Sequence, residues 1–457
     1  MASRGDVQRS TWIVRALHRL NVSFWFLPGC LITFGCVLAI VSVWLDHAGA
    51  SDAVASLGPP FSIGVETARQ LLSTLAGATV TVVSLVFSLT VVALTVAAGN
   101  LGPRLVDRYM RNRVTQVTMG LFSGTFAFTI MVLSDVGSSS AEGNVPRLSI
   151  TMALVFALSC VGWLTYAFHN LARSLQIDQA SAELASSLDA GLSEMAKQAR
   201  AVCGGTTEAE RAHAVPDGRI VSTDVSIGTG GYVEVIQYMS LLDLARREDL
   251  RIEMMVAPGD YAGPRDIAMR LHANTSVTET AVIRAAARCL IINATRTDTD
   301  DPLFNLHLLV EVAARALSPG VNDVYTALTC IDHLTGSLRL AFDVGLEPMA
   351  FVDSEDSQGA AGIVRIQTCS PGADGLVALV LPNLRRIACD NTTAALRVLA
   401  GCGRIARAVP SGHAGAIVLH REIDAFEAQA AEFARSEADL PALAAAAQAA
   451  RDALPTK

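Results

Sequence analysis

Leu71 to Ala98, LLSTLAGATVTVVSLVFSLTVVALTVAA, is the stretch that decides the fold class of this chain. It contains no ionisable side chain, and it is longer than the roughly 20 residues that a helix needs to cross the hydrocarbon core of a bilayer. The stretch is also rich in Ser, Thr, Ala and Gly, so the helix is apolar enough to insert and yet carries polar groups that lipid tails cannot satisfy. We therefore predict a membrane protein.

Three further segments lack Asp, Glu, Lys, Arg and His and are predicted to span the membrane: residues 27–45, 116–134 and 148–168. Arginines precede the first span, follow the fourth span and crowd the connector between the second and third, whereas the other two connectors are mainly acidic. The positive-inside rule then places the N-terminus, this arginine-rich connector and the chain after about His169 in the cytoplasm.

The chain after the fourth span is predicted to be mainly helical. Residues 1–169 form the transmembrane domain, 170–203 a stalk helix that continues the fourth span, and 204–218 a linker with Gly204 and Gly205. Residues 219–274 alternate like strands around one short helix, with residues 228–231 as a hairpin turn, and predict a small α/β module. Residues 275–457 predict a helical bundle. The expected fold class is thus mainly α, a four-helix transmembrane domain followed by a cytoplasmic domain.

Several classes of function are disfavoured by composition and motifs. The net charge is −8 and no basic patch is interleaved with aromatic residues, which argues against nucleic acid as a partner. No phosphate-binding glycine loop, nucleophile elbow or HExxH motif is present, and the nine cysteines form no CxxC pair. We therefore expect no catalytic residue, no metal and no cofactor, and reduced thiols in the cytoplasmic part.

Three stretches carry a resemblance to a known family: Phe87 to Met110, the following TQVTMGLFSGTF, and Arg296 to Leu334, which contains ALSPGVND. Together with the GYVEVI and APGDY segments they resemble the bacterial predicted membrane protein family known only as a domain of unknown function, number 2254. Val324 stands where members more often have proline, which weakens any role for a rigid turn there. The resemblance implies the membrane topology and brings no activity with it.

The second span presents a polar stripe with two interpretations. At steps of three or four residues one helix face collects hydroxyls and glycines, interrupted by two valines: Thr74, Gly77, Thr81, Ser84, Ser88, Val91, Val92 and Thr95. In one interpretation several copies of the helix surround an aqueous path, and the valines form a constriction that gates by dewetting. In the other, the small residues permit close helix packing and the hydroxyls bond to carbonyls of their own helix.

The remaining features of the membrane part are weaker. Arg104, Arg108, Arg111 and Arg113 follow the second span and suit contact with anionic lipids or, alternatively, a cationic pore mouth. The absence of a charged residue inside any span disfavours ion-coupled transport. A GxxxG pair in the third span predicts a close helix contact within or between subunits.

One block of the predicted cytoplasmic domain is rich in charged and amide side chains, and it predicts a possible ligand site made by Arg296, Asp301, Glu311, Arg315, Asn322 and Asp323. A structural interpretation competes, because Glu311 can pair with Arg315 one turn away and Asn322 or Asp323 can cap the next helix. A metal site from His307 and Glu311 needs further ligands, for example Asp332 or His333, that no spacing requires.

Two functional hypotheses follow. The first is a homo-oligomeric, channel-like protein of the bacterial inner membrane, with the second span around the pore and the cytoplasmic domain assembling or gating it. The second is a membrane-anchored sensor or scaffold whose cytoplasmic domain binds a small ligand or a protein. The expected partners are other copies of the chain, membrane lipids and ions or a small ligand. An enzyme acting on lipid comes third, because no nucleophile and base can be named.

Overall fold

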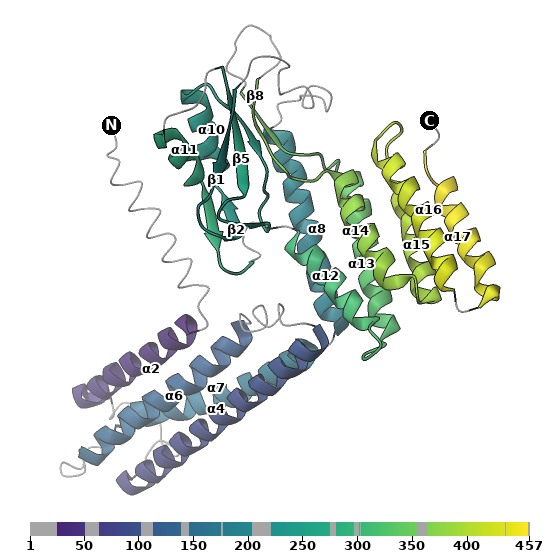
Figure 1. Ribbon diagram of the computed structural model, residues 1–457. Coiled ribbons are helices and arrows are strands. Elements are labelled where there is room, and N and C mark those ends of the chain that lie inside the picture. Colours follow the sequence, from purple (N-terminus) through teal and green to yellow (C-terminus); the bar gives the residue numbers. More distant parts are fainter. Residues whose placement is uncertain are drawn as a thin grey trace. The chain divides into compact units, whose positions relative to one another are not determined.

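The computed structural model describes residues 25–50, 64–101, 113–138, 146–174, 177–202, 221–274, 280–296, 301, 303–353, 363–434 and 436–455. The chain divides into two compact units, Met1–Ile177 and Asp178–Lys457. Figure 1 shows long helices alone in the first unit, and two small sheets with many helices in the second. The predicted fold class is confirmed, with four apolar helices followed by a mixed and largely helical part.

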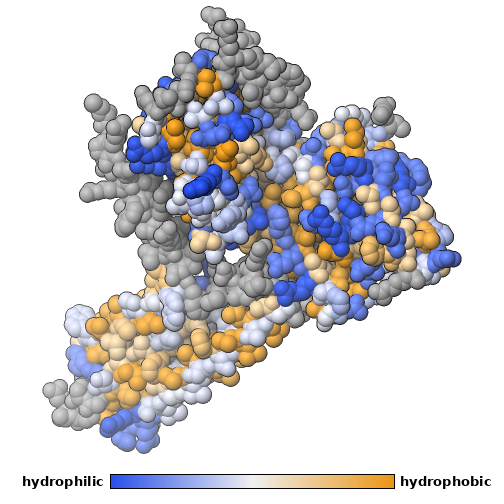
Figure 2. Space-filling model, viewed as in Figure 1, coloured by the Kyte–Doolittle hydropathy of each residue, from blue (hydrophilic) through white to orange (hydrophobic). Residues whose placement is uncertain are grey.

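The first unit contains α2 (Phe26–Leu45) with the short π-helix η1 (Asp46–Ala50), α4 (Val65–Leu101), α6 (Arg113–Ser138) and α7 (Arg147–Ser174). Each of the four α-helices is long and apolar enough to cross a membrane. Large apolar side chains are exposed along them, including Phe34 at 61% and Leu158 at 66%, and Figure 2 shows apolar residues over much of the surface of these helices. Such a surface suits lipid rather than water as its solvent.

α4 is longer than the predicted span, because it begins at Val65 and ends at Leu101. Its 37 residues extend over about 55 Å at a rise of 1.5 Å per residue, which exceeds the roughly 30 Å of the hydrocarbon core. The polar first turn, with Glu66 and Arg69, is continuous with the apolar part. The helix therefore tilts in the bilayer or extends beyond its apolar layer.

α6 is the central helix of the first unit, because it packs against α2, α4 and α7. One core cluster joins all four helices and includes the fully buried side chains of Leu72 and Phe128. The rings of Phe128 and Phe156 meet edge to face with centroids 5.2 Å apart. The indole N–H of Trp163 donates to the hydroxyl of Thr118 at 2.9 Å, which ties α7 to α6 with a polar contact.

Close backbone approach joins α2 to α6. A Cβ atom added to Gly35 would lie 2.5 Å from the carbonyl oxygen of Gly124, and one added to Gly124 would lie 2.8 Å from the carbonyl oxygen of Leu31. A Cβ atom on Gly120 would collide with the side chain of Leu31 at 2.6 Å. The GxxxG pair of the third span therefore serves a contact within the subunit, one of the two options that the sequence left open.

The second unit begins with α8 (Ile177–Val202), whose apolar face is buried at Leu184, Leu188 and Leu192. The hydroxyl of Ser337 on α13 (Val324–Asp343) donates to the Asp189 carboxylate at 2.5 Å. α8 is thus a packed helix of the second unit. The continuation of the fourth span into residues 170–203 as a stalk stays a prediction, because residues 175–176 lie outside the described residues.

Two sheets form the α/β part of the second unit. One has the order β1-β5-β3-β8-β7, with β1 (Val221–Ser226), β3 (Arg251–Met254), β5 (Ile267–Ala273), β7 (Ala350–Asp353) and β8 (Ile363–Gln367). The other has the order β4-β2-β6, with β2 (Gly231–Ile236), β4 (Tyr261–Ala262) and β6 (Leu290–Asn293). The helices α10 (Tyr238–Arg247) and α11 (Thr280–Ala287) contribute buried side chains to the same core as the two sheets.

Two predictions about this part were wrong. β1 and β2 belong to different sheets, so residues 228–231 connect sheets and are no hairpin turn. The α/β part also extends past residue 274, because β6, β7 and β8 come from the region predicted to be a helical bundle. These strands have only four or five residues, which is too short for their alternation to stand out between helices. β8 pairs in parallel with β3, a strand that is far from it in sequence.

The helical part of the second unit contains α12 (Phe304–Ala316), α13, α14 (Ala373–Ala388), α15 (Thr392–Ala406), α16 (Gly415–Phe433), the 3₁₀ turn η3 (Glu437–Asp439) and α17 (Leu440–Asp452). α15 lies between α13 and α17 and contacts both. Its Gly401 touches Thr335 of α13, because a Cβ atom there would lie 2.5 Å from the threonine methyl carbon.

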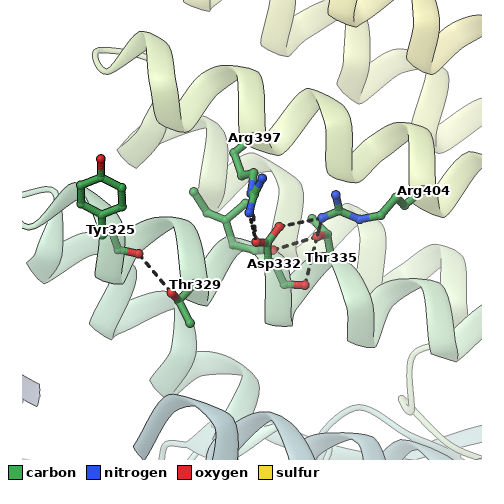
Figure 3. A network of polar contacts seen from close by, with 7 residues as sticks. Tyr325, Thr329, Asp332, Thr335, Arg397 and Arg404 are labelled. Carbon is green, nitrogen blue, oxygen red and sulfur yellow. Dashed lines mark hydrogen bonds and ion pairs between the residues drawn. The ribbon is translucent and has the colours of Figure 1, made fainter. Parts of the chain in front are cut away.

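A charged network reinforces the same helix pair. Figure 3 shows Asp332 of α13 between two arginines of α15. Arg397 donates to one carboxylate oxygen of Asp332 at 2.5 Å and 2.9 Å, and Arg404 donates to the other at 2.8 Å. Arg404 also donates to the hydroxyl of Thr335 at 3.0 Å. Asp332 is therefore committed to holding two helices together and is not presented as a metal ligand.

Candidate functional site

The polar stripe of α4 faces away from its own bundle. Its six hydroxyl and glycine positions are exposed: Thr74, Gly77, Thr81, Ser84, Ser88 and Thr95. Val91 and Val92 are exposed at 46% and 55%. The opposite face is the buried one, with Ala68, Leu72 and Ala76 packed inside the unit. Only 11% of the most apolar window of α4 is buried, against 44% for α6, so α4 is the least covered of the four helices.

Four of the five hydroxyls of the stripe donate to a carbonyl of their own helix. Thr74 donates to the carbonyl of Gln70 at 2.8 Å, Thr81 to that of Gly77 at 2.9 Å and Ser84 to that of Val80 at 3.1 Å. Thr95 does the same with Val91 at 2.9 Å. These bonds satisfy the donors and leave each hydroxyl oxygen able to accept, so the stripe tolerates lipid, another helix or water as its neighbour.

Of the four arginines of the predicted pore mouth, the structure describes one. Arg104, Arg108 and Arg111 lie outside the described residues, while Arg113 is the exposed first residue of α6. The arrangement of the four side chains as a group stays a prediction.

A buried polar cluster that the sequence did not single out lies at one end of the bundle. Asp46, which is 3% exposed, follows α2 and accepts from the backbone N–H groups of Leu148 and Ser149 at 3.0 Å and 2.9 Å. The hydroxyl of Ser149 also donates to Asp46 at 2.7 Å. The carboxylate thereby caps the N-terminus of α7 from another helix. The sequence signal was weak, because a cap normally comes from the residue just before its own helix.

In the second unit Arg296 and Asp301 meet, as the proposed ligand site required. The guanidinium group contacts one carboxylate oxygen of Asp301 at 2.6 Å and 2.7 Å, and the other oxygen accepts from the backbone N–H of Leu303 at 3.1 Å. The Asp301 side chain is 2% exposed. Burial raises the pKa of Asp301, and the adjacent Arg296 opposes that rise by favouring the charged form.

The backbone makes room for this pair at Gly259, in the APGDY turn. Its φ is +92°, and a Cβ atom there would lie 2.2 Å from a carboxylate oxygen of Asp301 and 2.8 Å from the Arg296 guanidinium. Both the positive φ and the close approach require glycine at this position.

The other four residues of the proposed site lie elsewhere. Glu311 and Arg315 are paired at 4.0 Å on α12, and Asp323 caps α13 by accepting from the Thr326 N–H at 3.2 Å. Asn322 occupies the left-handed region with φ +50°, in the turn between α12 and α13. This turn follows the C-terminal end of α12, whereas Asp301 precedes its N-terminal end. The six residues therefore divide among separate structural contacts, and Asp301 is the one of them that lines the cavity described next.

That cavity lies within the second unit and has a volume of about 750 Å³. Its walls come from α8, the start of α10, the APGDY turn, the start of α12, β7 and the segment after β8. Amide side chains (Gln198, Gln237 and Asn305), an aromatic pair (Tyr238 and Phe351) and methionines (Met195, Met239 and Met349) line it together with Asp301, Glu194 and small residues. Its size is that of a site for a small organic molecule.

No group of three or more His, Cys, Asp or Glu side chains in the described part of the chain is arranged to hold a metal ion. The described thiols of the second unit are poor nucleophiles, because they stay protonated near neutral pH. Burial raises the pKa of Cys330, Cys389 and Cys402 to about 12, and that of Cys369 to about 11.

Comparisons with known proteins agree with this architecture and add no activity. Uncharacterized proteins of Mycobacterium tuberculosis H37Rv and of Mycobacterium bovis are 26% identical over 325 residues, which is 70% of this chain and 60% of each relative. The chain thus matches little more than half the length of these relatives. No solved structure matches it. The model of one family matches residues 21–403, and the chain belongs to that family, described as predicted membrane protein (DUF2254).

Proposed function

We propose that this membrane protein assembles from several copies and forms a channel-like pore lined by α4. The observation that carries the proposal is the exposed stripe of α4, since the helix with the most hydroxyls is the one that its own bundle covers least. A helix whose function was only to anchor the chain would have no need to keep a polar, glycine-containing face outside the bundle.

Copies of α4 that meet through this face enclose a path with alternating polar and apolar levels. Ser84 and Ser88 supply hydroxyl oxygens to water or ions, while Val91 and Val92 form a ring of branched apolar side chains that opens and closes by wetting. In this proposal the protein resides in the bacterial inner membrane with both ends of the chain in the cytoplasm, where the second unit assembles or gates the pore.

The test is ion flux from liposomes that contain the purified full chain, compared with the double variant Ser84→Leu, Ser88→Leu. The double variant is expected to abolish flux while the fold and the oligomeric state persist. The matched control is Ser159→Leu on α7, since Ser159 is also exposed and also donates to a carbonyl of its own helix, that of Val155 at 2.8 Å. A chain that is monomeric in detergent and in nanodiscs would contradict the proposal.

A second function is favoured by the cavity of the second unit. In this alternative the four helices anchor and dimerise the chain, and the second unit acts as a sensor or scaffold that binds a small ligand or a partner. The alternative predicts that residues 178–457 fold alone, as their separate core suggests. Expression of this fragment followed by circular dichroism tests it. An aggregated or unfolded fragment would remove its main support.

A further inference from the structure

We propose that the cavity of the second unit binds a flat nitrogen heterocycle without acidic groups, of the purine nucleobase or nucleoside class. This inference rests on the second function proposed above, that the second unit binds a small ligand. It does not depend on the pore. The charge, the aromatic side chains and the hydrogen-bonding groups of the cavity wall favour this class of ligand.

The charge of the wall excludes an acidic ligand. Among the described residues that line the cavity the charged side chains are Glu194 and Asp301, and there is no Lys, Arg or His. The charge of Asp301 is compensated by Arg296 at 2.6 Å, and Glu194 is an exposed residue 3.8 Å from Lys197. A phosphate or carboxylate placed here would meet two carboxylates and no cationic wall group. The compensation of Asp301 also removes much of the attraction for an organic cation.

The apolar part of the wall contains an aromatic pair and three methionines. The rings of Tyr238 and Phe351 stack with centroids 5.0 Å apart and an interplanar angle of 23°, and both line the cavity. Met195, Met239 and Met349 adjoin them, and the flexible thioethers adapt to the outline of a ring. Stacking of a heterocycle on an aromatic side chain is favourable and accepts any base, because every base has a π-face. Phe351 is 5% exposed and is stacked against Tyr238, so the ring that can receive a planar ligand is that of Tyr238.

The polar groups of the wall include three amides, beside the hydroxyls of Ser187, Ser240 and Ser370 and the two carboxylates. Gln198 on α8, Gln237 at the start of α10 and Asn305 on α12 come from three different elements. A side-chain amide presents one acceptor and two donors in one plane, which matches the ring nitrogens and amino or keto groups at the edge of a purine. Amides from several directions together with one aromatic wall favour such a heterocycle over a purely apolar molecule.

The experiment measures binding to the full chain in nanodiscs by isothermal titration calorimetry with adenosine, guanosine and ATP. Hydrogen exchange then locates any protected segment. One of the two nucleosides is expected to bind, to protect residues 191–198 and 237–240, and to bind at least tenfold more tightly than ATP. Tighter binding of ATP, or binding of neither nucleoside, would overturn the inference.

Variants connect the binding to the wall. Gln198→Leu keeps the size of the side chain and removes one amide, and it is expected to weaken nucleoside binding about fivefold. The control is Gln179→Leu on the same helix, outside the cavity, which should leave affinity unchanged. Equal losses in both variants would place the ligand elsewhere and overturn the inference.

The experiment distinguishes a wrong class of ligand from a cavity that binds no ligand. Tetraethylammonium, a cation without hydrogen-bonding edges, serves as the third type of probe. If it protects residues 191–198 and is sensitive to Glu194→Gln while both nucleosides fail, the cavity binds a ligand but the heterocycle class is wrong. Flux and oligomeric state are measured separately and bear only on the pore.

Discussion

Two neighbouring helices of the first unit, α4 and α6, are both rich in Gly, Ser and Thr and use them in opposite ways. In α6 the space beside Gly120 and Gly124 is occupied by α2, because Cβ atoms at these glycines would collide with α2 at 2.6 Å and 2.8 Å. Around Gly77 of α4 a Cβ atom meets nothing within 4 Å. Similar composition therefore yields one helix that is the centre of the bundle and one whose polar face is left outside.

Small residues in a span therefore indicate that another group can approach the helix closely, but they do not identify that group. In α6 the partner is a helix of the same chain, and the approach is close enough that backbone atoms touch. In α4 the described helices of the same unit leave the polar face uncovered, since the buried face is the opposite one.

The largest effect is expected for Gly124→Leu. Its Cβ would lie 2.8 Å from the backbone oxygen of Leu31, which cannot rotate away, so α2 must separate from α6. We expect a loss of more than about 3 kcal/mol in the free energy of unfolding, measured by denaturant titration of the purified protein in detergent. Unchanged stability would mean that α2 and α6 do not meet at this glycine.

A smaller loss, of about 2 kcal/mol, is expected for Asp46→Ala. The change leaves two backbone N–H groups of α7 without their acceptor in a buried place. The same denaturant titration measures it. Glu66→Ala is the control, since Glu66 is an exposed acid in the first turn of α4, and it should change stability by less than about 0.5 kcal/mol. Equal effects of the two variants would show that Asp46 is not a special cap.

In the second unit Asp332→Asn is expected to cost about 1 kcal/mol. Two arginines of α15 lose their shared carboxylate, but all three groups are partly exposed to solvent, which limits the loss. Asp343→Asn on the same helix is the control, because the described partner of Asp343 is one exposed arginine, Arg339 at 3.3 Å. Hydrogen exchange of α13 and α15 reports the change locally. A larger effect in the control would reverse our ranking of the two ion pairs.

The smallest effect on the fold, and the sharpest test of the comparison, is expected for Gly77→Leu. The open space accepts the side chain, and leucine favours a helix by up to about 1 kcal/mol relative to glycine, so the subunit should keep its stability. The oligomer proposed above should dissociate or lose its flux, which light scattering and liposome assays detect.

Gly162→Leu on α7 is the matched control for Gly77→Leu, since a Cβ atom at Gly162 also meets nothing within 4 Å. It should leave both stability and assembly intact. If the two glycine variants behave alike in assembly, the face of α4 has no special role between subunits.

Prediction from sequence succeeded where a single element carries its own signal. Uninterrupted apolar runs gave the four helices of the first unit within a few residues of their ends, with two exceptions. α4 begins six residues early because its polar first turn is continuous with the helix, and α7 ends six residues after the predicted span. The side chain of Asp323 is near enough to its own helix to be named as one of two possible caps. Local geometry was sufficient in these cases.

Prediction failed where the partner is distant in sequence. The sheets draw β6, β7 and β8 from a region that reads as helical, and Asp46 caps a helix that begins about a hundred residues later. Of the six residues proposed as one ligand site only Asp301 lines the cavity, whose walls come from segments between residues 187 and 371. The hydrophobic periodicity of one segment does not predict contacts with a segment that is distant in sequence.

The sequence by itself determined that this chain is a membrane protein with four apolar helices, because the length and hydropathy of a span depend only on the bilayer that it crosses. Only the tertiary structure decided which face of α4 stays outside the bundle, which glycines have another helix packed against them and where the cavity of the second unit lies. Those outcomes depend on which surfaces pack against each other, and packing between distant segments has no signature within either segment alone.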